Sequence, residues 1–460
     1  MNCWSICPAI YFRIKIGGIY LNTREVIYNI LYDVFIGKGY SNLVINKYIK
    51  KSKLEKKDEN LIREVVYGTI ENFYYERWII RKFSSVKYKK IEDPVKIILL
   101  MSLYQLFKMN NIPEHAICHE AVELSKKVAN ISSSKFVNGI LRNVMRNKEE
   151  IHNNFEKLGR KDKLSIQYSY PLWAIENLIE EHNEEFVYDL VSHSNDRPEF
   201  SIRVNTIKIS RENLKSDLED EGYKVSTTRY ANEGLIIENP QGIFMTKWFL
   251  DGYFIVQDEA SMLVGQILNP SLDSKVLDLC SAPGGKTTHI AQLMKNTGCV
   301  VSQDIHEHKL LLIEGNAKRL GLENIEIELQ DATELEVNPC YDFVLADVPC
   351  SGTGIVRRKP EIKWSKTEKD IIDLLVLQKE ILKAASTQVK DNGILVYSTC
   401  SINKSENLNL IESFLSENKD FQLKPFENEV NLDGSEKGYL EIYYNELEMD
   451  GFFIAKLQKK

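Results

Sequence analysis

The chain has 460 residues, of which 43% are hydrophobic and 27% charged, so two or three globular domains with sizeable cores are expected. No apolar run reaches the ~18 residues that cross a bilayer, and the eight cysteines lack the spacing of a disulfide framework. We therefore expect a reduced, cytoplasmic protein with no membrane contact.

Charge is distributed unevenly along the chain. The net charge is −7, yet residues 1–160 hold 27 Lys and Arg against 16 Asp and Glu, a balance of +11, and the remainder carries −18. A basic arm on an acidic body can attract a polyanion such as nucleic acid. A solvated helical face would explain the same charges, so both interpretations stay open.

The N-terminal third has a helical pattern. Residues 1–21 are apolar, interrupted by Arg13 and Lys15, and do not follow a signal-peptide pattern, so we expect an extension outside the fold. Over residues 22–160, stretches such as TREVIYNILYDVFI place apolar residues at three- and four-residue spacing, which predicts an all-helical domain. His115, Cys118 and His119 share one helical turn, but without a second ligand cluster we expect no metal.

Two further regions follow. Residues 161–251 predict linker helices and then a small α/β module, in which FSIRVNTIKI alternates like a strand and SRENLKSDLEDEGY is a capped helix. Over residues 252–460 strands and helices alternate regularly, which predicts a Rossmann-like, doubly wound parallel sheet. The stretches GYLEIYY and DGFFIAKLQ predict two last strands, one of them antiparallel at the edge.

A glycine-containing loop, CSAPGGKTTHIAQL, follows the first strand of this sheet. Gly284 and Gly285 let the backbone turn tightly beside the N-terminus of a helix, where a ligand can bind. The loop almost fits the phosphate loop GxxxxGK[ST], but Cys280 replaces the first glycine and Pro283 removes an amide donor. A nucleotide triphosphatase is therefore disfavoured, and the dinucleotide motif GxGxxG is absent.

Acidic residues end the next three strands. Asp304 is placed to accept hydrogen bonds from ribose hydroxyls, Asp331 to meet an adenine edge, and Asp347 ends the fourth strand. Any one of them could be a helix cap, but three in succession at the ligand-binding edge favour a nucleoside. A nucleoside without phosphates, next to a glycine loop, predicts S-adenosylmethionine as the cofactor.

Two cysteines, Cys350 in DVPCSGTG and Cys400 in YSTCS, follow adjacent strands that open on the same crevice. A methyl donor beside two thiols suggests methylation of cytosine at carbon 5, because a thiolate added to carbon 6 makes carbon 5 nucleophilic. Small buried cysteines would be the structural alternative. The residues alone do not decide which thiol attacks.

Basic residues near these motifs are candidates for RNA contact. Arg357, Arg358, Lys359 and Lys363 follow the Cys350 turn, and Trp364 could stack on a base. Arg203 and Asn205, in a strand of the small module, are weaker candidates, and a solvated loop is the alternative.

The sequence resembles the RNA cytosine-C5 methyltransferases, in particular the bacterial branch that acts on 16S rRNA. The resemblance lies in DLCSAPGGKTTHIAQL, VQDEASML, DVPCSGTGIVRRKPEIKW, YSTCSINKSEN and DGFFIAKL. NTREVIYNILYDV, IPEHAICHEAVELSKK and FVNGILRNVMR resemble the NusB-type helical domain of that branch. The resemblance extends from about residue 22 to the C-terminus.

The resemblance implies specific roles. It makes Cys400 the nucleophile, Cys350 the thiol that helps release the product, and Asp347 a residue that holds the cytosine. It places the cofactor on Cys280, Ser281, Ala282, Pro283, Gly284, Gly285, Lys286, Asp304, Asp331 and Asp347. It implies a monomer that methylates 16S rRNA of the small ribosomal subunit. A tRNA methyltransferase and a non-catalytic NusB-like RNA-binding factor are the alternatives.

Overall fold

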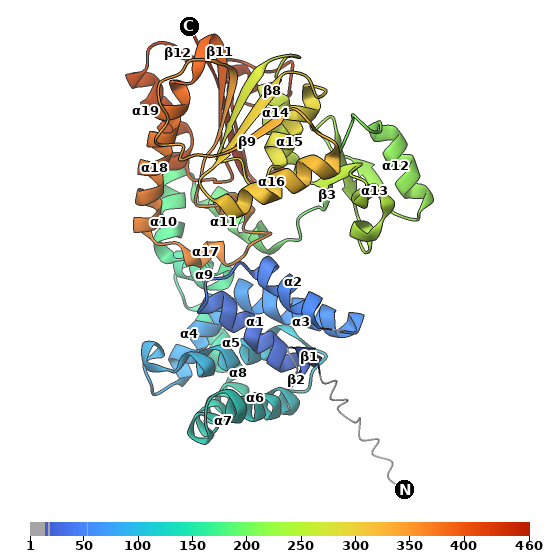
Figure 1. Ribbon diagram of the computed structural model, residues 1–460. Coiled ribbons are helices and arrows are strands. Elements are labelled where there is room, and N and C mark those ends of the chain that lie inside the picture. Colours follow the sequence, from blue (N-terminus) through green and yellow to red (C-terminus); the bar gives the residue numbers. More distant parts are fainter. Residues whose placement is uncertain (1–13, 17–18, 53) are drawn as a thin grey trace. The chain divides into compact units, whose positions relative to one another are not determined.

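The computed structural model describes residues 14–16, 19–52 and 54–460, and they form two compact units (Figure 1). The first comprises the described residues up to Asn195 together with Arg358–Ser365. The second comprises Asp196–Arg357 and Lys366–Lys460. None of the helices in the described part of the chain is long and apolar enough to span a bilayer.

The first unit is helical, as the sequence predicts. Its helices are α1 (Thr23–Phe35), α2 (Ser41–Lys51), α3 (Lys56–Glu71), α4 (Phe73–Phe83), α5 (Asp93–Lys108), α6 (Glu114–Val128), α7 (Ile131–Arg146), α8 (Lys148–Glu156), α9 (Arg160–Tyr168), α10 (Leu172–Glu181), α11 (Glu184–Ser192) and α17 (Ile362–Ser365). Helices α9 to α11, expected as linkers to the small module, belong to this unit, and α9 contacts α4. The expected extension lies mostly outside the described residues; its described part forms the antiparallel strands β1 (Ile14–Ile16) and β2 (Ile19–Leu21).

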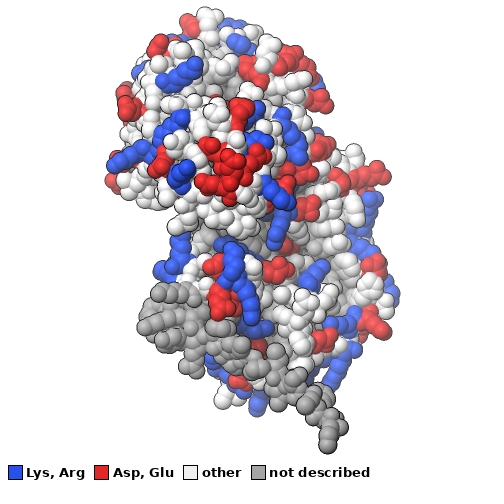
Figure 2. Space-filling model, turned by 90° about the vertical axis from the view of Figure 1, so that its right-hand side faces the viewer, with Lys and Arg blue, Asp and Glu red and all other residues white. Residues whose placement is uncertain are grey.

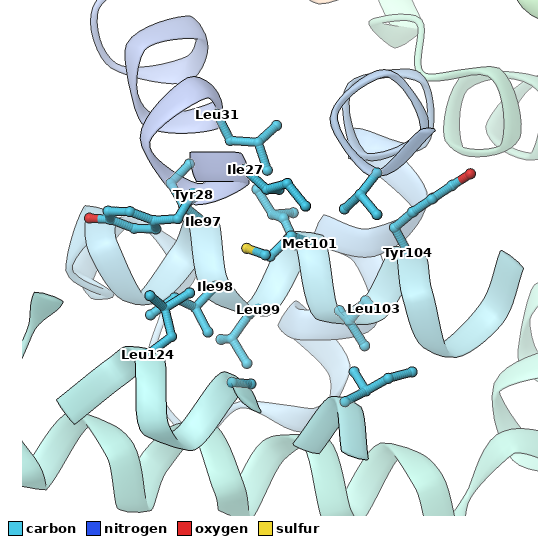
Figure 3. Close-up of a cluster of buried hydrophobic side chains, with 14 of the residues drawn as sticks. Ile27, Tyr28, Leu31, Ile97, Ile98, Leu99, Met101, Leu103, Tyr104 and Leu124 are labelled. Carbon is cyan, nitrogen blue, oxygen red and sulfur yellow. The ribbon is translucent and has the colours of Figure 1, made fainter. Parts of the chain in front are cut away.

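Helix α5 forms the centre of this unit. Pro94 lies in its first turn, where the missing amide proton costs nothing, and apolar residues then surround the helix on all sides. Figure 3 shows Ile97, Ile98 and Met101 of α5 packed with Ile27 of α1 and Leu124 of α6. A helix that is apolar all round is stable only when neighbours cover every face, which explains its central place.

The second unit begins with a small antiparallel sheet. Its strand order is β4 (Val225–Thr227), β5 (Gly234–Ile237), β3 (Ser201–Val204) and β6 (Phe254–Val256). Helices α12 (Arg211–Asp220) and α13 (Lys247–Leu250) accompany it, and Leu214 and Leu218 of α12 share a core with Ile202 of β3. This is the predicted small α/β module.

A larger sheet forms the rest of the unit. Its strands run in the order β12 (Phe421–Leu423), β14 (Phe452–Lys459), β11 (Val389–Thr399), β10 (Tyr341–Asp347), β7 (Lys275–Leu279), β8 (Cys299–Asp304) and β9 (Ile325–Leu329), and β13 (Tyr439–Ile442) also pairs with β14. Strands β7 to β11 are mutually parallel. The predicted antiparallel strand exists as β14, but it lies between β11 and β12 rather than at the edge.

Helices cover both faces of this sheet, because successive residues of its central strands place apolar side chains on both faces. Val276 of β7 joins one core with α14 (Glu259–Leu268), α15 (Gly285–Leu293) and α16 (Glu307–Leu320). The next residue, Leu277, joins the other core with α18 (Glu368–Ser386) and α19 (Leu408–Glu417). Neighbouring parallel strands β7 and β10 have their crossovers on opposite sides, so their carboxyl ends flank the crevice where ligands bind in such sheets.

Candidate active site

The loop after β7 is shaped by two left-handed residues. Cys280 has φ 57° and Gly284 has φ 94°, and a Cβ on Gly284 would lie 3.2 Å from Cα of Ile313. Glycine is therefore required at position 284, since a side chain would meet both strain and a fixed backbone. The turn carries Ser281, Ala282 and Pro283 on to the start of α15. The loop thus places its backbone at the carboxyl edge of the sheet.

A buried network of hydrogen bonds connects this loop to strands β7 and β8. Thr287 Oγ1 donates to Oδ2 of Asp278 at 2.6 Å, and Ser302 Oγ donates to Oγ of Ser281 at 2.8 Å. Burial raises the pKa of Asp278 to about 7, although the bond from Thr287 lowers it in part. Asp278 was not among the residues predicted from the sequence; its signal is a carboxylate inside an apolar strand, KVLDL.

Asp304 and Asp331 differ in their surroundings. Asp304, at the end of β8, is buried and accepts bonds from the backbone N–H of His306 at 2.9 Å and of Ala282 at 3.3 Å. Its carboxylate thereby lies directly beside the cofactor loop. Asp331 follows β9 and accepts bonds from the backbone and hydroxyl of Thr333, which lower its pKa. Both lie at strand ends, as the sequence predicts.

Lys286 and Asp347 join the loop to the next strand. Nζ of Lys286 lies 2.6 Å from Oδ2 of Asp347, and Ser398 Oγ of β11 donates to Oδ1 at 2.7 Å. Burial alone would lower the pKa of Lys286, but the Asp347 carboxylate outweighs it, and the net pKa is raised. Lys286 is therefore a fixed ammonium group at neutral pH, held in the crevice.

The two cysteines meet at this edge. Sγ of Cys350 lies 3.2 Å from Sγ of Cys400, and both residues are partly exposed. The pKa of Cys350 is raised well above its usual range, first by the contact with Cys400, then by burial and by the charges of Cys400 and Glu406. The charge of Cys400 in turn raises the pKa of Lys286, so the Cys400 sulfur and the ammonium group stabilise each other's charged forms.

Cys280 differs from these two thiols. Burial, followed by the charges of Asp347 and Asp304, raises its pKa to about 12. A thiol with so high a pKa stays protonated at neutral pH and is a poor nucleophile. Among the described residues, no group of three His, Cys, Asp or Glu side chains is arranged to hold a metal ion.

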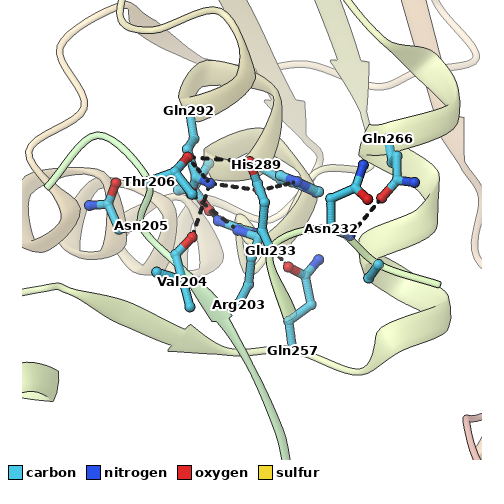
Figure 4. Close-up of polar contacts among 12 residues, drawn as sticks. Arg203, Val204, Asn205, Thr206, Asn232, Glu233, Gln257, Gln266, His289 and Gln292 are labelled. Carbon is cyan, nitrogen blue, oxygen red and sulfur yellow. Dashed lines mark hydrogen bonds and ion pairs between the residues drawn. The ribbon is translucent and has the colours of Figure 1, made fainter. Parts of the chain in front are cut away.

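Arg203 and Asn205 lie in the protein interior, which corrects the expectation that they contact RNA. Arg203 is fully buried, and its guanidinium donates to Gly285 O at 2.6 Å and to Thr288 Oγ1 at 2.9 Å. It also donates to Gln257 (Figure 4). Asn205 Nδ2 donates to the carbonyls of Gly252 and Leu320. Because Gly285 begins α15, Arg203 supports the glycine loop between β7 and α15.

The same network contains an acidic residue and a histidine. Nε2 of His289, on α15, lies 2.8 Å from Oε2 of Glu233, which also accepts from Gln292 at 2.7 Å (Figure 4). Burial and the Arg203 charge lower the pKa of His289, so its neutral ring donates Nε2–H to the carboxylate. These contacts bind the small module to the cofactor helix.

The basic residues after the Cys350 turn divide into two groups. Lys363 is buried and donates to Asn195 Oδ1 at 2.6 Å, and Trp364 stacks on Phe35 at 4.9 Å while its Nε1 donates to Ile70 O. Neither side chain is available to RNA, because both pack within the helical unit. Arg357, Arg358 and Lys359 are partly exposed and stay candidates. Of these, Arg357 donates to Met449 O, and Lys359 lies 4.5 Å from the Tyr40 ring.

The distribution of charged side chains on one face of the molecule bears on where RNA could bind. On the face that Figure 2 shows, basic and acidic side chains are interspersed, and neither sign covers that face. The charge imbalance between the two parts of the sequence therefore does not appear there as one continuous patch.

Three family models match consecutive parts of the chain. Residues 21–146 match the NusB family, and residues 170–243 match a ferredoxin-like domain of RsmF/B-like methyltransferases. Residues 265–458, which hold the glycine loop and both cysteines, match the 16S rRNA methyltransferase RsmB/F model.

Curated proteins and solved structures resemble the whole chain. A probable ribosomal RNA small subunit methyltransferase B of Bacillus subtilis is 34% identical, covering 95% of this chain and 99% of that protein. Its counterpart in Escherichia fergusonii is 32% identical over 89% of this chain and 92% of that protein. The crystal structure of PH0851 superimposes with a TM-score of 0.81 at 26% identity, covering 95% and 98% of the two chains. NSun6 from Pyrococcus horikoshii, solved with SFG, gives a TM-score of 0.55 at 25% identity over 62% and 97%.

Proposed function

Because the chain belongs to the RsmB/F family of 16S rRNA methyltransferases, we propose that it methylates carbon 5 of one cytidine in 16S rRNA through a covalent bond to Cys400. The enzyme is S-adenosylmethionine-dependent, as its family is. The observation that carries the proposal is the pair of sulfur atoms 3.2 Å apart, beside the ion pair of Lys286 and Asp347. A protein that only bound RNA would have no need of that arrangement.

The surroundings of the two thiols differ in charge, and this difference supports Cys400 as the nucleophile. The ammonium group of Lys286 interacts with Cys400 and favours its thiolate, which is the reactive form of a cysteine. Cys350 instead keeps its proton, because the contact with Cys400 and burial raise its pKa, and the charge of Glu406 adds to these effects. Its S–H can then donate a hydrogen bond to the Cys400 sulfur, which stabilises that thiolate before attack and after release.

The reaction then has a defined order of bonds. The Cys400 thiolate adds to carbon 6 of the cytosine, and the electron pair of the 5,6 double bond becomes available at carbon 5. Bound S-adenosylmethionine supplies the methyl group that carbon 5 takes. A base removes the proton from carbon 5, the double bond re-forms, and the sulfur–carbon bond breaks to return the Cys400 thiolate. Cys350 assists this last step as a hydrogen-bond donor to the departing sulfur.

The residues at the strand ends fit the cofactor. The buried carboxylate of Asp304 lies against the loop, where it would accept hydrogen bonds from ribose hydroxyls, and Asp331 would meet the adenine edge. The positive φ of Gly284 and its close packing against Ile313 of α16 fix the backbone of the loop that the cofactor would contact. Asp347 and Lys286 offer both charges that a zwitterionic amino acid tail requires. Asp347 would also hold the cytosine.

Membership of this family supports ribosomal RNA as the substrate. We further propose that the RNA is 16S rRNA of the small ribosomal subunit, that the enzyme acts as a monomer, and that it works in the cytoplasm. Arg357, Arg358 and Lys359 follow the Cys350 turn in the chain and are partly exposed, so they are the proposed contacts to phosphates.

Bisulfite sequencing of total RNA with and without the gene tests the function. We expect one cytidine in 16S rRNA to lose its protection when the gene is deleted and to regain it when the wild-type gene is returned. The Cys400→Ala gene should not restore it. Loss of protection at a tRNA position instead would assign the enzyme to tRNA, and no change at any position would overturn the proposal.

A further inference from the structure

A fully buried carboxylate, Glu406, lies behind the two thiols. It belongs to the short helix η5 (Lys404–Glu406) after β11. Its Oε1 accepts hydrogen bonds from Ser351 N at 2.8 Å and Gln378 Nε2 at 2.9 Å. Its Oε2 accepts from Ser351 Oγ at 2.5 Å, Ser401 Oγ at 2.6 Å and Asn403 Nδ2 at 2.8 Å. One carboxylate therefore connects the two cysteine turns and α18.

The arrangement is symmetrical with respect to the thiols. Ser351 follows Cys350 and Ser401 follows Cys400, and both serine hydroxyls donate to the same oxygen of Glu406. The two hydroxyls also lie 3.0 Å from each other. Because each serine is bonded covalently to its cysteine, holding both hydroxyls on one oxygen restrains the backbones of the two cysteine turns relative to each other, and with them the positions from which the two sulfur atoms extend.

Other contacts limit how far this carboxylate can move. Tyr397 is buried in β11, and its hydroxyl donates to the backbone carbonyl of Glu406 at 2.7 Å. Gln378 of α18 donates both to Glu406 and to Pro349 O, the residue before Cys350. A buried charge is costly unless donors surround it, and five donors do so here.

We propose that Glu406 is a positioning residue that holds the thiols of Cys350 and Cys400 in register for the reaction. The assignment rests on the proposed roles of the two cysteines. Glu406 is fully buried and acts through Ser351 and Ser401. Its negative charge also raises the pKa of Cys350, after the larger effects of Cys400 and burial. The other titratable or charged groups around the sulfurs are Tyr397, Asp347 and Lys286.

Cross-linking of the two thiols measures their register without RNA or cofactor. Dibromobimane reacts with two neighbouring thiols, each thiolate displacing one bromide, and becomes fluorescent only when both have reacted. The wild-type protein should cross-link Cys350 to Cys400, and peptide mass spectrometry identifies the linked pair. Cys350→Ala and Cys400→Ala give the background from the other cysteines.

The test variant is Glu406→Gln, which keeps the shape but removes the charge and one acceptor. We expect its cross-linking rate to fall about tenfold or more, the lower end of the range for loss of one hydrogen bond to a charged group. Labelling of each single thiol by a monofunctional alkylating agent should persist. Glu259→Gln is the matched control, because Glu259 is also buried and accepts two backbone bonds, from Tyr230 and Ala231, away from the thiols. Glu259→Gln should cross-link at the wild-type rate.

Further variants cover the case in which Glu406→Gln does not fold. Ser351→Ala and Ser401→Ala each remove one hydroxyl contact and should each slow cross-linking, with normal binding of S-adenosylmethionine as the test of folding. Unchanged cross-linking in folded Glu406→Gln, or in both serine variants, would overturn the proposal. Normal cross-linking in the wild-type protein without methylation of any RNA would instead contradict the proposed function and leave the positioning role standing.

Discussion

The sulfur atoms of Cys350 and Cys400 lie 3.2 Å apart although fifty residues separate them in the chain. Strands β10 and β11 are parallel neighbours, and Asp347 pairs with Ser398, so the turns that follow end at the same level of the sheet. Two thiols in contact can share one proton, which leaves one sulfur reactive and the other a donor. The first two predictions concern this division of roles.

Cys400→Ala should abolish methyl transfer and leave S-adenosylmethionine affinity unchanged, because the thiol acts on the base. Transfer of labelled methyl groups to RNA and calorimetric titration of the cofactor measure the two quantities. Cys340→Ala is the control, since Cys340 precedes β10 at the other end of the strand. Turnover in Cys400→Ala near the wild-type rate would reassign the nucleophile.

Cys350→Ala should allow attack and methyl transfer but slow the release of RNA, because the departing sulfur lacks its hydrogen-bond donor. The stalled species should migrate as a protein–RNA conjugate on a denaturing gel. It should disappear in Cys350→Ala/Cys400→Ala, which lacks the attacking sulfur. A conjugate from Cys400→Ala but not from Cys350→Ala would exchange the two roles.

Asp304→Asn should weaken cofactor binding by about 1–3 kcal/mol, the range for a lost charge-assisted hydrogen bond. The amide keeps an oxygen for the N–H groups of Ala282 or His306, so the loop can retain its shape. Calorimetry with S-adenosylmethionine measures the change. Asp391→Asn is a suitable control, because Asp391 is 82% exposed and lies at the start of β11. Equal affinities in the two variants would mean that Asp304 has only a structural role.

Asp278→Asn should remove a pH dependence of stability. The folded pKa of about 7 lies above the usual value of 3.8, so the native state holds a proton that the unfolded chain has released. The free energy of unfolding of the wild type therefore falls as pH rises from about 4 to about 7. The variant cannot titrate at this position, so its free energy of unfolding does not fall with pH for this reason. Its amide Oδ1 can still accept the hydrogen bond from Thr287. Its stability relative to the wild type should increase between pH 5 and pH 8, measured by urea unfolding.

Asp331→Asn is the matched control for that experiment. The pKa of Asp331 is lowered by its bonds from Thr333, so its stabilisation is present above the unfolded pKa and is lost only as pH falls below it. Its difference from the wild type should stay constant between pH 5 and pH 8. A constant difference for Asp278→Asn as well would show that Asp278 does not titrate in this range.

Several elements could be predicted because their signals are local. The glycine at position 284 adopts a positive φ that other residues avoid, and carboxylates at the ends of β8 and β9 mark the binding edge of a parallel sheet. Helix α5 has Pro94 in its first turn and a continuous apolar run. In each case neighbours in the chain carry the physical constraint, so a short stretch of sequence is sufficient.

Burial of polar side chains could not be predicted in this way. RNA-binding surfaces are rich in residues of the same types as Arg203, Lys363 and Trp364. Each of these side chains is instead held by a partner far away in the chain: Thr288, Asn195 and Phe35, respectively. Whether a cation or an indole ring faces solvent depends on what packs over it. The proposed role of Glu406 could not be predicted from the sequence for the same reason, because only the folded chain brings the hydroxyls of Ser351 and Ser401 to one carboxylate oxygen of Glu406.

Short motifs predicted the parts of the candidate site: the glycine loop, the acidic strand ends and the two cysteines after adjacent strands. The folded chain was needed to see where β14 inserts in the sheet, which basic residues stay at the surface, and how the two sulfurs are held in contact. Backbone conformation and chemical type are properties of a few consecutive residues, whereas strand pairing, burial and charge environment arise from residues that meet only when the chain folds.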